Sequence, residues 1–149
     1  MRREFPPGFK CGTATSATQV EGGCEDHDWM RFAREPGRIV GGDTPTVACD
    51  HWNRWPTDIE LQKHLGVRAH RLSVEWARIE PRSGELDRSA LEHYRRVVGT
   101  LRDAGIEPWV TLYHFTLPTW VSDQGGVLHE DLPALLKRLS RHVARATIW

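Results

Sequence analysis

The chain has 149 residues, with 20 Lys and Arg against 20 Asp and Glu, so its formal net charge is zero. A balanced charge supplies no long-range field, so neither nucleic acid nor a membrane is expected as a partner. Hydrophobic residues make up 39% and charged residues 27%, which is typical of a globular chain and not of a disordered one. No apolar run approaches the roughly 18 residues of a membrane span, and the length predicts one domain over residues 1–149.

The first residues and the cysteines indicate the expected cellular location of the protein. Residues 1–7 carry charges but no apolar stretch behind them, so no secretory signal is expected. The three cysteines are an odd number without metal-binding spacing, which favours reduced thiols in a cytoplasmic protein. Two clusters rich in Asp and His, residues 26–28 and 50–51, fit no common metal site by their spacing, so neither a metal nor another cofactor is expected.

Short strands and longer helices alternate along the predicted chain. The strands are rich in β-branched or aromatic residues and comprise residues 9–14, 69–76 and 109–114. Three helices are expected between and after them. The first begins at the capping box of residues 57–60 and runs to Leu65, before Gly66. The second begins at Asp87 or Ser89, with a second box at 89–92, and stops at Gly105. The third follows Leu132 and Pro133.

The order of these elements predicts a parallel sheet. Twice a helix ends at a glycine and an apolar residue leads into a strand, and strand starts near residues 69 and 107 give a spacing of 38 residues. This is the length of a β/α unit, and successive units form a parallel sheet. By the same spacing, a fourth strand either begins at residues 146–149 or is missing.

Polar residues in the second strand favour a barrel over an open sheet. Arg71, Ser73 and Glu75 are predicted on one face, whereas a parallel strand covered by helices on both sides is apolar on both faces. An open doubly wound sheet usually carries a glycine-rich phosphate loop after its first strand, and residues 15–23 contain no G-x-G-x-x-G pattern. The expected fold is therefore α/β, of the (β/α)8 TIM-barrel type, incomplete, with about three β/α units.

Four blocks of sequence resemble family 1 glycoside hydrolases, the β-glucosidase and β-galactosidase family, in the same order. They are FKCGTATSATQVEG at residues 9–22, CDHW at 49–52, HRLSVEWARIEP at 70–81 and TLYHFTLP at 111–118. The resemblance implies a (β/α)8 barrel, retaining hydrolysis of β-linked sugars, and a β-linked glycoside or monosaccharide as ligand. It also implies that Gln19 and His114 hydrogen-bond sugar hydroxyls and that Arg71 lies beside the nucleophilic carboxylate, whose pKa a fixed cation lowers.

The sequence departs from the family pattern at several positions. Phe115 stands where the family usually has Trp, which keeps an apolar wall but loses the indole donor. Thr18 and Cys11 also replace the residues that the family signature favours. In the family, the acid/base Glu lies in an Asn-Glu-Pro block and the nucleophile in a Glu-Asn-Gly block, and neither tripeptide occurs in these 149 residues. Both catalytic carboxylates are therefore expected to be absent from this chain.

Each site residue also has a structural interpretation. Gln19 is alternatively a turn residue with backbone partners, and His114 a strand-end residue, which reaches the site only if its strand ends or bulges at Tyr113. Arg71 and Glu75 are alternatively an ion pair inside the barrel. The seven tryptophans suit stacking on sugar rings, but core packing is the simpler account of each. Glu21 is interpreted as structural.

These observations leave three interpretations of function. The first is a β-glucosidase-like hydrolase of β-D-glucosides or related sugars, present as a truncated chain that is inactive alone. The second is a non-catalytic sugar-binding or interaction fragment of the same fold. The third is a truncated or frameshifted gene product without a function of its own. An incomplete barrel has open sheet edges, so self-association, or pairing with a missing C-terminal segment, is expected in each case.

Overall fold

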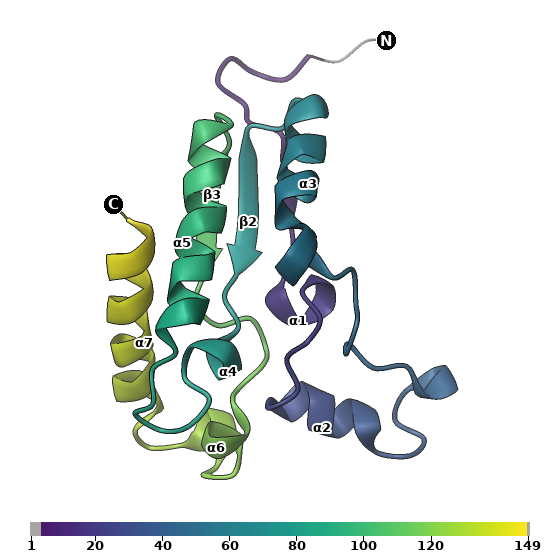
Figure 1. Ribbon diagram of the computed structural model, residues 1–149, viewed down its shortest axis with the longest axis vertical. Coiled ribbons are helices and arrows are strands. Elements are labelled where there is room, and N and C mark those ends of the chain that lie inside the picture. Colours follow the sequence, from purple (N-terminus) through teal and green to yellow (C-terminus); the bar gives the residue numbers. More distant parts are fainter. Residues whose placement is uncertain (1–3, 149) are drawn as a thin grey trace.

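A three-stranded parallel sheet lies at the centre of the computed structural model, which describes residues 4–148 (Figure 1). Its strands are β1 (Gly12–Ala14), β2 (Ala69–Ser73) and β3 (Glu107–Thr111), in the order β1-β2-β3. Arg71 of β2 pairs in register with Ala14 of β1 and with Trp109 of β3. The parallel β/α arrangement expected from the spacing is thereby confirmed.

Helices fall into two groups around this sheet. The long helices α3 (His51–His64), α5 (Arg88–Asp103) and α7 (Leu132–Thr147) pack in sequence, α3 on α5 and α5 on α7. Figure 1 shows short helices beyond the carboxyl ends of the strands. The short elements are α1 (Ala17–Val20), α2 (Asp28–Arg34), α4 (Trp76–Ile79), α6 (Thr119–Ser122) and two 3-10 turns at Val40–Gly42 and Gly126–Leu128. No helix in residues 4–148 is both long and apolar enough to cross a membrane.

The start of α3 differs from the expected one. The helix begins at His51 and not at the capping box beginning with Thr57, which lies inside it. Tertiary contacts hold the six additional residues: the ring of Trp52 stacks on His93 of α5 at 3.6 Å, and the Arg78 guanidinium lies 4.0 Å from the Trp52 ring. This packing outweighs the local signal at Thr57, because a capping residue contributes only about 1 kcal/mol.

Both ends of α5 follow the local signals. Asp87 is the N-cap, and its carboxylate accepts from the backbone N–H groups of Ser89 and Ala90 at 2.7 and 3.2 Å. Ser89 therefore lies within the helix, and the box expected at 89–92 does not cap it. After the helix, Gly105 adopts a φ of 73°, the left-handed conformation that favours glycine.

The strands are shorter than expected, and residues 146–148 form no strand. The first strand covers 12–14 of the expected 9–14, β2 ends at Ser73 because the short helix α4 begins at Trp76, and β3 lies at 107–111 and not at 109–114. Helix α7 continues to Thr147, with Ile148 in right-handed helical geometry at its C-cap. The apolar face of α7 packs on the core, so the backbone stays helical there. Trp149, the last residue of the expected strand, lies outside the described residues.

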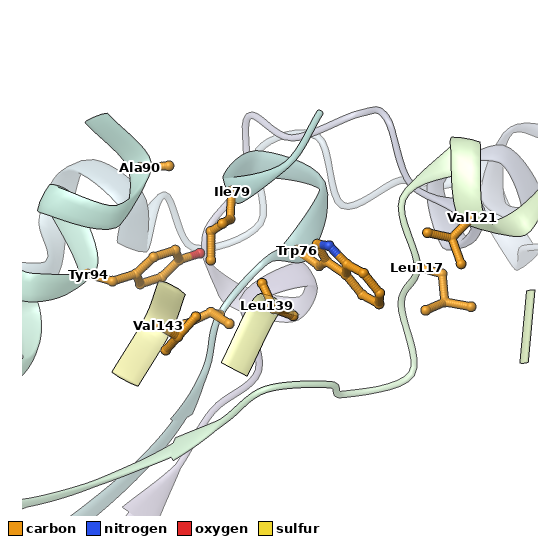
Figure 2. Close-up of a cluster of buried hydrophobic side chains, with 9 residues drawn as sticks. Trp76, Ile79, Ala90, Tyr94, Leu117, Val121, Leu139 and Val143 are labelled. Atoms are coloured by element: carbon orange, nitrogen blue, oxygen red, sulfur yellow. The ribbon is translucent and has the colours of Figure 1, made fainter. Parts of the chain in front are cut away.

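Two apolar clusters stabilise the layers. One lies between α3, β2, α5 and β3 and contains Ile59, Leu72, Val97, Val98, Leu101 and Ile106. The other lies near the carboxyl ends of the strands, and Figure 2 shows its labelled side chains: Trp76, Ile79, Ala90, Tyr94, Leu117, Val121, Leu139 and Val143. Trp76 is only 1% exposed, so this tryptophan is a core residue and not a sugar platform. The second cluster forms the floor under the loops that follow the strands.

Candidate sugar-binding site

The three strands end at one edge of the sheet, and hydrogen bonds connect the loops that leave it. The N–H of Thr15 donates to the carbonyl of Arg71 at 2.8 Å, and the N–H of Val74 donates to the carbonyl of Thr111 at 3.1 Å. The hydroxyl of Ser73 accepts from the N–H of Ala17 at 2.8 Å, which fixes the start of α1 on β2. The segments that carry Gln19, Glu75 and His114 therefore leave the sheet at the same end.

Gln19 lies on the single turn of α1 and is exposed. Its Oε1 atom accepts a hydrogen bond from the hydroxyl of Ser16 at 2.6 Å. Within residues 4–148 no protein group bonds to its Nε2 atom, so this side chain is held by a side-chain contact and not by the backbone partner of the turn interpretation. The amide is oriented while its two donors stay available.

His114 and Phe115 lie beyond the end of β3. The strand ends at Thr111, so His114 is outside it, and Phe115 adopts a φ of 57°, a conformation unusual for a bulky residue. The Phe115 ring meets His114 at 5.2 Å and Trp29 of α2 edge-on at 5.5 Å, and it remains 39% exposed. Because β3 ends at Thr111, before Tyr113, the strand alternation does not direct His114 toward the helices.

Glu75 does not pair with Arg71. Because β2 ends at Ser73, the alternation of the strand does not extend to Glu75, which is instead the N-cap of α4. Its side chain is 1% exposed and accepts hydrogen bonds from the hydroxyls of Thr18 and Thr116. The prediction that Glu75 shares a strand face with Arg71 is wrong, since the turn redirects its side chain. Within the described residues Arg71 makes no ion pair; it lies half-buried beside Trp109, which is 60% exposed.

A second buried carboxyl group lies beneath the same loops. Glu21 is paired with Arg78 at 3.1 Å and accepts from the hydroxyl of Tyr94 at 3.0 Å. Burial raises the pKa of Glu21 to about 8; the nearby charge of Glu75 adds to this effect, whereas Arg78 and Tyr94 oppose it. These contacts agree with a structural role for Glu21. The tyrosine links the two acids, because its hydroxyl also accepts from the backbone N–H of Glu75.

Sequence reasoning missed the two threonines that join this network. Thr18 and Thr116 are buried polar residues 98 positions apart, and their hydroxyl oxygens lie 3.2 Å from each other. The only sequence signal is the departure at Thr18 from the residues that the family signature favours. No comparable signal marks Thr116, because its contact with Glu75 depends on the path of the loop after β3.

The Asp- and His-rich clusters have structural partners. His27 caps α2, with its Nδ1 atom accepting from the N–H of Met30, and Asp28 accepts from the N–H of Leu117 at 3.0 Å. His51 Nδ1 lies 2.6 Å from the carboxylate of Asp58. Across residues 4–148 no three His, Cys, Asp or Glu side chains are gathered as metal ligands.

The fold and this edge define the class of the protein: an α/β protein built from β/α units, with polar and aromatic side chains at the carboxyl ends of its parallel strands. The family model described as "Glycosyl hydrolase family 1" matches residues 1–145. Because this match covers most of the chain, the chain belongs to glycosyl hydrolase family 1.

Known relatives agree with this assignment. Beta-glucosidase A of Thermotoga maritima is 40% identical over an alignment of 145 residues, which covers 93% of this chain and 32% of the relative. Beta-glucosidase A of Acetivibrio thermocellus is 41% identical over an alignment of 133 residues, which covers 85% of this chain and 30% of that protein. The chain therefore spans about a third of the length of the curated relatives it matches.

Solved structures match the fold closely. The AHE enzyme from Alicyclobacillus herbarius superposes with a TM-score of 0.90 at 36% identity, over 97% of this chain and 35% of that one. The family 1 β-glucosidase from Thermotoga maritima gives a TM-score of 0.90 at 39% identity, over 95% of this chain and 33% of that one. The Thermotoga enzyme has also been solved in complex with castanospermine and with deoxynojirimycin.

Proposed function

We propose that residues 1–149 are the single-domain, sugar-binding N-terminal part of a (β/α)8 β-glycosidase. The whole enzyme would be β-glucosidase-like and would hydrolyse β-D-glucosides or related sugars by a retaining mechanism. Membership of glycosyl hydrolase family 1 supports this proposal, as do the names of the matched β-glucosidases. The observation that carries it is the position of Gln19 and His114 on loops that leave the same end of the sheet.

The chemistry of these side chains suits a sugar. The Gln19 amide offers both donors and an acceptor, and a neutral imidazole at His114 offers one of each, so both can bind hydroxyl groups, which donate and accept. The exposed ring of Phe115 provides an apolar surface against the carbon face of a sugar ring. In this proposal Arg71 lies beside the nucleophilic carboxylate of the whole enzyme.

We further propose that the 149-residue chain does not hydrolyse glycosides alone. Retaining hydrolysis needs two carboxyl groups roughly 5 Å apart that can reach the glycosidic bond. The two carboxyl groups beneath this edge, those of Glu21 and Glu75, are 5% and 1% exposed and are bound to protein partners. Their engagement favours the non-catalytic, sugar-binding interpretation for this chain by itself.

Titration with glucose, followed by NMR on the ¹⁵N-labelled chain, tests the site. We expect saturable shifts in the segments around Gln19 and His114. Gln19→Ala and His114→Ala should each weaken binding by about 2- to 10-fold, because a lost hydrogen bond costs roughly 0.5–1.5 kcal/mol.

Two exposed residues provide matched controls for this titration. Gln124→Ala, after α6, and His64→Ala, at the end of α3, remove the same side-chain types outside the segments that carry Gln19 and His114. They should leave the affinity unchanged. Shifts that persist unaltered in both Gln19→Ala and His114→Ala would show that glucose binds elsewhere, and a wild-type chain without saturable shifts would contradict binding by this chain.

A further inference from the structure

We infer that Glu75 is a positioning residue, which couples the segment carrying Gln19 to the segment carrying His114 and Phe115. Two buried hydroxyl groups make the connection, those of Thr18 and Thr116. The inference rests on the proposed function only in taking a sugar as the ligand of these segments. The coupling itself concerns the protein alone and is tested separately.

The geometry places one carboxyl group between two loops. The hydroxyl of Thr18 donates to Oε2 of Glu75 at 2.7 Å, and the hydroxyl of Thr116 lies 3.3 Å from the same oxygen and 3.4 Å from Oε1. Thr18 directly precedes Gln19, and Thr116 directly follows Phe115. Each residue expected to contact sugar is thus within two positions of a hydroxyl bound by Glu75.

Glu75 is itself held by rigid parts of the fold. Its backbone N–H donates to the Tyr94 hydroxyl of α5 at 2.8 Å, and its Oε1 atom accepts from the N–H of Ala77 in α4 at 3.4 Å. Both partners are buried in the core. Since the acid is fixed to the floor of the site, its hydrogen bonds to the threonines fix the loops relative to that floor.

The two loops have little regular structure of their own. Helix α1 has only four residues, and residues 112–118 belong to no helix or strand. In the described part of the chain, Thr18, Glu75 and Thr116 form the hydrogen-bonded link between α1 and residues 114–116. All three are buried, and removing one threonine hydroxyl deletes one of the few hydrogen bonds that the buried Glu75 carboxyl group accepts.

The test uses the full 149-residue chain and removes one hydroxyl at a time. Valine has nearly the shape of threonine, so Thr18→Val and Thr116→Val delete the hydrogen bond with little change of volume. We expect Thr18→Val to shift the amide resonances of His114 and Phe115 and lower their heteronuclear NOE. Thr116→Val should do the same at Gln19. Thr18→Ser, which keeps the hydroxyl, should restore the wild-type values at His114, and the exposed Thr57→Val should shift neither segment.

Coupling also predicts that the two substitutions are not additive. In each segment, the amide shifts of the double variant should differ from wild type by no more than the larger of the two single-variant differences, because either substitution alone breaks the link. Changes confined to the mutated segment in both single variants would overturn the inference. So would a failure of Thr18→Ser to restore His114, since packing and not the hydroxyl would then be responsible.

Glucose binding separates this inference from the proposed function. If the wild-type chain binds glucose, Thr18→Val and Thr116→Val should each raise Kd, although neither residue is expected to touch the sugar; an unchanged Kd in both variants would contradict the positioning role. If the wild-type chain does not bind glucose, the proposed function fails, while the NMR shifts still decide whether the hydrogen-bonded link of Thr18, Glu75 and Thr116 couples the loops.

Discussion

The hydroxyl of Tyr94 accepts a hydrogen bond from the backbone N–H of Glu75 at 2.8 Å. The same hydroxyl donates to Glu21, so one tyrosine on α5 connects both buried acids under the strand ends. Because Tyr94 also packs among the apolar side chains of the core, the polar network and the core share one residue (Figure 2). A change at this residue therefore affects packing and hydrogen bonding together, and a substitution that removes only the oxygen separates the two.

Replacing Tyr94 by Phe should destabilise the fold by about 1–3 kcal/mol, because it leaves the buried N–H group of Glu75 without its partner and removes the Tyr94 hydrogen bond to the buried Glu21, which keeps only Arg78. Urea unfolding at fixed pH measures the free energy of unfolding. Tyr113→Phe is the matched control: this half-buried tyrosine lies outside the network, and its loss of a hydroxyl should cost less than 0.5 kcal/mol or so. Equal stability of Tyr94→Phe and the wild type would show that the network does not contribute.

The contribution of Glu21 to the free energy of unfolding should fall as the pH rises from about 4.5 to about 8. Burial raises the pKa of Glu21 to about 8 in the folded chain, whereas an unfolded Glu has the ordinary value of 4.5. In this interval the folded state binds more protons than the unfolded state, so its stabilisation is present below pH 4.5 and is lost as the pH passes 8, with a limiting slope of about 1.4 kcal/mol per pH unit.

Glu21→Gln removes this titration. The difference between the free energies of unfolding of wild type and variant, measured by urea unfolding, should therefore change steadily between pH 5 and 8 and stay constant above pH 8. Burial lowers the pKa of His70 to about 4 and that of His93 to about 4, which raises stability with pH up to about 6.5 in both proteins. The two histidines cancel in the difference. A constant difference across the whole range would refute the raised pKa of Glu21.

The purified 149-residue chain should not hydrolyse p-nitrophenyl β-glucoside above the uncatalysed rate. General acid–base and nucleophilic catalysis each supply orders of magnitude in rate, and the two acids beneath the site are buried and hydrogen-bonded. Assays of the wild type and of Glu75→Gln should be indistinguishable. Turnover that disappears in Glu75→Gln would instead make Glu75 a catalytic carboxylate.

The chain should self-associate or be only marginally stable by itself. One side of β3 has no neighbouring strand in the described fold, and a groove of about 430 Å³ lined by Val110, Leu112 and Val143 opens between β3 and α7. Unpaired strand edges beside apolar surface are templates for association. Sedimentation velocity should show oligomers whose fraction rises with concentration.

Trp109→Lys places a charge on exposed β3 and should shift the chain toward monomer, whereas Leu128→Lys, on an exposed 3-10 turn, should not. A wild-type chain that is a monomer and unfolds cooperatively above about 60 °C, the upper part of the mesophile range, would show that three β/α units are self-sufficient.

Local signals in the sequence determined both ends of α5, the C-terminal end of α3 and the order of the units. Asp87 caps α5, and Gly66 and Gly105 adopt positive φ values where α3 and α5 are followed by strands. These features were predictable because a cap or a left-handed residue acts within a few positions of itself. The motif blocks likewise identified the family, since a short segment carries each of them.

Tertiary structure alone decided the start of α3 and the role of Glu75. Trp52 stacks on a histidine 41 positions away, and this contact extends α3 beyond its local capping signal. Glu75 leaves the face of Arg71 because β2 ends two residues earlier, and its partners Thr18 and Thr116 lie 57 and 41 positions away. Periodicity within a strand cannot reveal hydrogen bonds that exist only after the strand has ended and two distant loops have met above a packed core.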